Sequence, residues 1–143
     1  MKNDSTELLS QCDAGIAMAL SAINEVLPAT ENPHLRKTLH MSKAQHENLQ
    51  HQTRDLLRVR HAPGKKPNAM AKSMNYLKTH TMLAMKPGDG TVADLVVTGC
   101  NMGIKNLHRY QNQYKAADEA CKNVADKLIG LEADLANSLY PYL

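Results

Sequence analysis

The chain has no phenylalanine and no tryptophan, and its aromatic residues, 3% of the total, are all tyrosines. A core without large aromatic side chains has to be built from aliphatic residues, alanine and the eight methionines. Valine and isoleucine are sparse, and apolar and polar residues rarely alternate, which argues against strands. Alanine, leucine and methionine are strong helix formers. The composition therefore predicts an all-α protein and excludes a β-sheet core.

The chain also lacks the segments that would direct it into or across a membrane. No stretch reaches the roughly 18 apolar residues that a membrane-spanning helix needs. Residues 1–7 are polar and do not match the apolar segment of a signal peptide. We therefore expect a cytoplasmic protein.

Cysteine is scarce as well, with three residues at positions 12, 100 and 121. Their odd number, and the absence of Cys-x-x-Cys spacing, argue against a disulfide framework and against a zinc knuckle. Each cysteine falls on an apolar helical stripe. This placement predicts a small buried thiol at each position.

Five stretches have the periodicity and the boundaries of helices in one domain, and they cover residues 5–27, 33–61, 68–85, 91–113 and 117–140. Asp4 or Ser5 is the expected N-cap of the first helix. Asn32 followed by Pro33 is a start signal for the second helix, with the proline at its first position. Thr91 is the expected N-cap of the fourth helix.

The lengths of the connections predict how these helices are arranged. The short connection over residues 28–33 makes the first two helices antiparallel neighbours. Residues 62–90 are too long for a hairpin loop, so we expect a crossover along the bundle. No glycine or proline marks a break in residues 91–140, but one helix there would be about 75 Å long and too long for its partners. We therefore place a break at residues 112–117, which completes a second hairpin.

The second helix carries an apolar stripe with a histidine at its centre. Positions alternately four and three residues apart share one helical face, and here they are Leu35, Leu39, Ser42, His46, Leu49, Thr53 and Leu56. An aliphatic residue is expected at the middle position. His46 is therefore either a hydrogen-bonded core residue or the remnant of a metal site.

Two glycines interrupt the apolar stripe of the fourth helix. Glycine in a helix interior costs roughly 1 kcal/mol relative to alanine, so a packing reason is expected for Gly99 and Gly103. We predict that they let a neighbouring helix approach closely.

Two short motifs resemble those of the ferritin-like superfamily. Lys43-Ala-Gln-His46-Glu-Asn-Leu49 resembles the Glu-x-x-His segment of the second helix in that family. Leu128-Ile-Gly-Leu-Glu132-Ala-Asp-Leu135 resembles its fourth helix. The chain is most similar to small bacterial ferritin-like proteins, along essentially its whole length. The resemblance implies a ferritin-like four-helix bundle of two antiparallel hairpins, joined by a long crossover that carries a short extra helix.

The chain departs from the family at the metal ligands. A di-iron site in such bundles takes one Glu from each of two helices and Glu-x-x-His from each of the other two. Lys43 replaces one of these carboxylates, and its ammonium group would repel a cation. Leu135 replaces the histidine of the last helix. His46 and Glu132 remain as candidate ligands, so no cofactor is expected, and di-iron or another divalent metal is the alternative.

Two other arrangements of polar side chains follow from the same helices. Lys43 and Glu132 occupy positions where two metal-bound carboxylates would face each other, which predicts an ion pair in place of the metal. His40, Glu47 and His51 share another face of the second helix. We expect these three side chains to be solvated, with a surface site for a divalent metal as the alternative.

The crossover is more basic than the whole chain, whose net charge is only +3. Against the single acid Asp89, the crossover carries Lys65, Lys66, Lys72, Lys78 and Lys86. A solvated surface is the expected role of these lysines. Contact with phosphates or with an acidic partner is the alternative.

The sequence predicts function by class only. It contains no Gly-x-Ser-x-Gly motif and no phosphate-binding loop, so catalysis is not favoured. We expect a structural or interaction role, as a homodimer formed through an exposed face rich in methionine or alanine. The first alternative is a metal-binding protein or oxidoreductase with a rearranged site around His46 and Glu132. The second is a weak binder of nucleic acid or of an acidic partner.

Overall fold

A computed structural model of the chain describes residues 3–64 and 69–143, without the side chains of residues 69–73. Five α-helices follow one another, α1 (Asp4–Val26), α2 (Pro33–Val59), α3 (Ala69–Met85), α4 (Asp89–Gln113) and α5 (Glu119–Leu139). Short 3-10 turns, η1 (Leu27–Ala29) and η2 (Tyr140–Tyr142), follow α1 and α5. The described residues contain no strand. The prediction of an all-α protein is confirmed, and each helix end lies within two residues of its predicted position.

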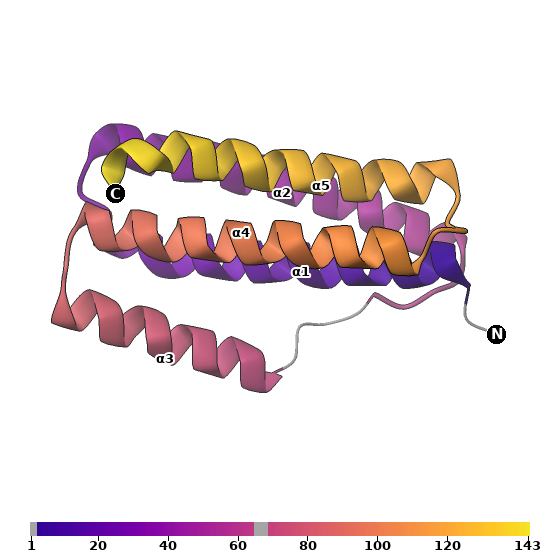
Figure 1. Ribbon diagram of the computed structural model, residues 1–143, viewed down its shortest axis with the longest axis horizontal. Helices are drawn as coiled ribbons and strands as arrows, with labels where there is room; N and C mark the ends of the chain where they lie inside the picture. Colours follow the sequence, from indigo (N-terminus) through magenta and orange to yellow (C-terminus); the bar gives the residue numbers. More distant parts are fainter. Residues whose placement is uncertain (1–2, 65–68) are drawn as a thin grey trace.

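Four helices form a long bundle and the fifth lies beside it (Figure 1). Helices α1, α2, α4 and α5 run along the longest axis of the molecule, and α3 packs on α1 and α4. The described residues therefore contain five helices, four in the bundle and α3, a helix of 17 residues, in the crossover where the extra helix was expected. Within the described residues, no helix has both the length and the apolar character that crossing a membrane requires.

The break between the last two helices lies at residues 114–118, as predicted. Asp118 ends the turn by capping α5, where its carboxylate accepts a hydrogen bond from the amide of Cys121 at 3.0 Å. The side chain of Arg60, from the end of α2, contacts the same carboxylate at 2.6 Å. A polar cap fixed by a second helix therefore replaces the missing glycine or proline signal.

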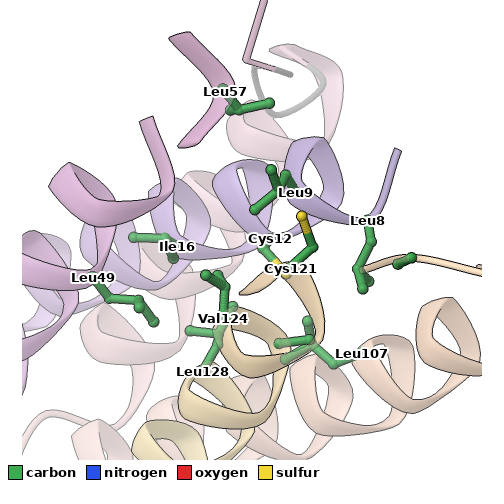
Figure 2. Packing of buried hydrophobic residues seen from close by; sticks show 12 residues of the cluster. Leu8, Leu9, Cys12, Ile16, Leu49, Leu57, Leu107, Cys121, Val124 and Leu128 are labelled. Atoms are coloured by element: carbon green, nitrogen blue, oxygen red, sulfur yellow. The ribbon is translucent and has the colours of Figure 1, made fainter. Parts of the chain in front are cut away.

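The interior is filled by two clusters of buried side chains, one towards each end of the bundle. Figure 2 shows the first cluster, which consists of Leu8, Leu9, Cys12, Ile16, Leu49, Leu57, Leu107, Ala117, Cys121, Val124, Ala125 and Leu128. The second cluster consists of Ile23, Val26, Leu35, Leu39, Val92, Ala93, Val96, Val97, Cys100, Leu135, Ala136 and Leu139. Each large aliphatic side chain contributes about 1.5–3 kcal/mol on burial. All three cysteines are buried and unbridged, as predicted.

The apolar stripe of α2 faces this core almost as predicted. Six of its seven expected positions are buried, including His46 at its centre. The last position is wrong, because Leu57 rather than Leu56 is the buried leucine at the end of the helix. Leu56 lies partly buried against the edge of the first cluster.

Side chains in the first turn of α1 fasten the opposite loop rather than cap their own helix. Asn3 is the N-cap, and its side chain accepts a hydrogen bond from the amide of Thr6. Asp4 accepts from the amide of Ala116, and Ser5 from the amide of Asp118, both at 2.9 Å. The prediction of Asp4 or Ser5 as the cap is wrong, because both reach the turn between α4 and α5.

A second polar contact joins two connections at the other end of the bundle. The N-cap prediction for Asn32 is confirmed by the hydrogen bonds that it accepts from the first turn of α2. The carboxylate of Asp89, at the start of α4, accepts from the amides of Glu31 and Asn32 at 2.8 and 3.0 Å. The expected cap Thr91 is instead buried inside the first turn of α4, which begins two residues earlier.

We predict that Asp89→Ala lowers the free energy of unfolding by about 1–3 kcal/mol, because the amides of Glu31 and Asn32, the second in a partly buried contact, lose a charged acceptor. Urea denaturation followed by circular dichroism measures this loss. Asp94→Ala is the matched control, since Asp94 is exposed on the same helix and makes no hydrogen bond among the described residues. Equal losses in the two variants would show that the Asp89 contact does not fasten the loops.

Candidate functional site

A histidine and a carboxylate meet in the middle of the bundle. His46 of α2 is fully buried, and Glu132 of α5 is only 6% exposed. The imidazole Nε2 lies 3.1 Å from Oε1 of Glu132. These two candidate ligands, which are 86 residues apart in the chain, are therefore brought into direct contact.

The other ring nitrogen determines which tautomer His46 adopts. Its Nδ1 lies 2.8 Å from the backbone carbonyl oxygen of Ser42, one turn earlier in α2. A carbonyl oxygen only accepts, so Nδ1 carries a proton and donates it. The contact at Nε2 must then hold a further proton between the imidazole and Glu132, as an ion pair or as a neutral pair.

The surroundings of His46 favour the ion pair. Burial on its own lowers the pKa of the imidazole, since it penalises the charged form. The hydrogen bond to Glu132, the negative charge of that carboxylate and the Ser42 carbonyl act in the opposite direction. Together they raise the pKa of His46 above its ordinary value. A protonated Nε2 has no lone pair for a metal, so the pair is a structural contact as it stands.

Cys100 of α4 completes the surroundings of Glu132. Burial, the negative charge of Glu132 and a hydrogen bond to its carboxyl group raise the pKa of the Cys100 thiol. Burial is also the main cause that raises the pKa of Cys12 to about 12 and that of Cys121 to about 11. All three cysteines therefore stay as thiols, which are poor nucleophiles and poor metal ligands.

The predicted ion pair between Lys43 and Glu132 does not form. Their charged groups are not within 4.0 Å of each other, and Glu132 contacts His46 instead. The physical reason is position, because His46 lies on the buried face of α2 whereas Lys43 lies at its half-exposed edge. A lysine there keeps its ammonium group hydrated at little cost.

The three side chains considered for a surface metal site do not contact the His46–Glu132 pair. His40, Glu47 and His51 are all exposed on α2, as expected for solvated side chains. Among the described residues, no three histidine, cysteine, aspartate or glutamate side chains are placed to hold a metal ion. A site made by Glu47 and His51 alone stays a prediction.

The lysines of the crossover are only partly described. Lys78 and Lys86 are exposed on and after α3. Lys65, Lys66 and the side chain of Lys72 lie outside the described residues. The proposed basic patch therefore stays a prediction as a whole.

A groove that the sequence did not predict opens above Glu132. It lies between α1, α3 and α4, with a volume of about 400 Å³. The small residues Ala14, Ala19, Gly99 and Gly103 line its sides, and Glu132 lies at its floor. The only signal in the sequence is the recurrence of alanine and glycine at helical spacing on α1 and α4.

The prediction that Gly99 and Gly103 bring a neighbouring helix close is wrong. A Cβ atom added at Gly99 would meet nothing within 4 Å. At Gly103 it would lie 3.9 Å from the carboxyl carbon of Glu132, which is a side chain and not helix backbone. Both glycines instead line the groove, and Gly103 lies beside the Glu132 carboxylate.

No protein-family model matches the chain, and neither a curated protein nor a solved structure matches it. The ferritin-like resemblance therefore stays a prediction. The site has to be interpreted from its own geometry.

We predict that His46→Leu and Glu132→Leu each lower the free energy of unfolding by about 3–5 kcal/mol, because each leaves a buried polar partner uncompensated. The double variant should lose much less than the sum, since no charge is left behind. His51→Leu, on the exposed face of the same helix, is the control and should change stability by less than about 0.5 kcal/mol. Urea denaturation measures all four variants, and additive losses would contradict a direct pair.

The pair should also make stability depend on pH. Because the folded-state pKa of His46 is raised, its contribution is complete below the ordinary histidine value of 6.5 and is lost as pH rises through the raised pKa. The stability difference between wild type and His46→Leu should therefore be largest at acidic pH and shrink towards alkaline pH. A difference that grows with pH would contradict the ion pair.

Proposed function

We propose that this chain is a non-catalytic, ferritin-like bundle that acts by binding a protein chain, and that the bound chain is a second copy of itself. The observation that carries the proposal is the apolar outer surface of α3. Met74 and Leu77 are each 63% exposed there, and Met85 is 82% exposed. Solvent contact with several large apolar side chains is unfavourable, and such patches mark interaction sites.

The spacing within α3 makes this surface a single face. Leu77 follows Met74 by three residues, and Met85 lies eight residues further on, so all three share one side of the helix. Methionine side chains adapt their shape to a partner surface. One apolar helix face can also be self-complementary, because a two-fold axis brings the same patch of each copy into contact. A symmetric α3–α3 contact is the simplest arrangement that covers it.

The ferritin-like part of the proposal is supported by the order of the helices. Two hairpins, α1–α2 and α4–α5, are connected by a long crossover that contains α3. The pair His46 and Glu132 occupies helix positions that resemble ligand positions of that family. Its imidazole proton and the protonated thiol of Cys100 support a structural role for this centre. No specific observation favours the oxidoreductase or the nucleic-acid alternative over this one.

We predict that the wild-type chain sediments as a dimer at micromolar concentration and that Leu77→Glu is monomeric, because a charge at the centre of the contact would lose its hydration. Sedimentation velocity measures both states. Met41→Glu is the matched control, since Met41 is an equally accessible apolar residue on α2, and this variant should remain dimeric. A monomeric wild type would sink the proposal, and so would dissociation in both variants.

A further inference from the structure

The groove between α1, α3 and α4 has features that the proposed dimer does not use. Met74, Leu77 and Met85 of the apolar patch do not line the groove, whereas Asn75, Thr79 and Met82 of the same helix do, and Thr79 is buried. Its volume of about 400 Å³ lies within the range of about 300–1,000 Å³ that is usual for small-molecule sites. The walls are mostly apolar, with methionines at positions 18, 82 and 102 near its rim.

The floor of the groove offers an acceptor with spare capacity. An ionised carboxylate can accept about four hydrogen bonds. His46 binds Oε1 of Glu132, and the Cys100 thiol lies near the same carboxyl group. Glu132 is among the residues that line the groove, so Oε2, the carboxylate oxygen that His46 does not contact, is the atom available to a ligand there. Gly103 leaves the approach to Oε2 open.

The charges around the groove favour a cation. Among the described residues that line it, Glu25, Asp94 and Glu132 are acidic, and Lys78 is the only basic side chain. Because His46 balances the charge of Glu132, an excess of one negative charge remains. Glu25 belongs to α1 and Asp94 to α4. An excess of negative charge around an apolar cleft raises the local concentration of cations.

From this combination we infer that the groove binds a small hydrophobic amine, whose protonated nitrogen contacts Glu132 and whose apolar body lies against the small residues of α1 and α4. The carboxylates of the lining match the positive charge of such a ligand, and the alanine, glycine and methionine side of the lining matches its apolar part. The ammonium group would satisfy the open acceptor positions of Glu132, and the ion pair with His46 would hold the carboxylate in place. This site and the α3 dimer contact are independent of each other.

Three ligands of equal length and different charge test the inference. We expect n-octylamine to bind the full chain more tightly than octan-1-ol, and octanoate not to bind, as measured by isothermal titration calorimetry at neutral pH. Amide NMR shifts caused by octylamine should centre on Gly99 and Gly103. Octanoate binding as well as octylamine, or shifts centred elsewhere, would overturn the inference.

Two variants test separately the charge of Glu132 and the space in the groove. Glu132→Gln keeps the size of the side chain and should weaken octylamine binding about tenfold, because the charge-assisted contact is lost, with little change for octan-1-ol. Gly99→Leu should abolish binding of both, since the position is open and the new side chain fills the groove. It also keeps the test valid if Glu132→Gln does not fold. Glu47→Gln, exposed on α2, is the control and should bind as wild type. Unchanged octylamine binding in folded Glu132→Gln, or in Gly99→Leu, would overturn the inference.

Discussion

A buried histidine in a helix stripe has to find an acceptor, and the contact between His46 and Glu132 meets this requirement. An imidazole without partners would lose its hydration with no compensation in the core of the bundle. Nδ1 donates a hydrogen bond to the carbonyl oxygen of Ser42, and Nε2 donates one to the carboxylate of Glu132 on α5. Because the contact joins α2 to α5 at one defined height, it favours one register of these helices over others that would bury the same leucines.

The same contact determines the chemistry available around it. The Glu132 carboxylate is bound to a protonated imidazole and is no longer free for a metal. Burial, together with the charge of Glu132, raises the pKa of the neighbouring Cys100 thiol and keeps it protonated. Glu132 also lines the groove between α1, α3 and α4. Glu132, which resembles a metal ligand in sequence, thus binds His46 through one oxygen and lines the groove.

Helix α3 explains why the molecule has both a groove and an apolar surface. The four long helices complete a bundle without it, and α3 packs on the outside of α1 and α4 (Figure 1). Small residues on α1 and α4 leave space beneath its inner side, while Leu77 and its neighbours remain exposed on its outer side. The two ends of the bundle are fastened by polar contacts such as Asp89 with the α1–α2 connection, so they do not depend on how α3 packs.

The sequence by itself determined the helices and the buried stripe of α2, because apolar periodicity and capping residues are local properties of the chain. It also identified His46 and Glu132 as candidate metal ligands. Only the tertiary structure decided which side chains meet. Glu132 pairs with His46 rather than with Lys43, since one turn of α2 separates a buried position from its half-exposed edge. Asp4 fastens a distant loop, and Gly99 opens a groove, because both outcomes depend on what lies across the bundle at that height.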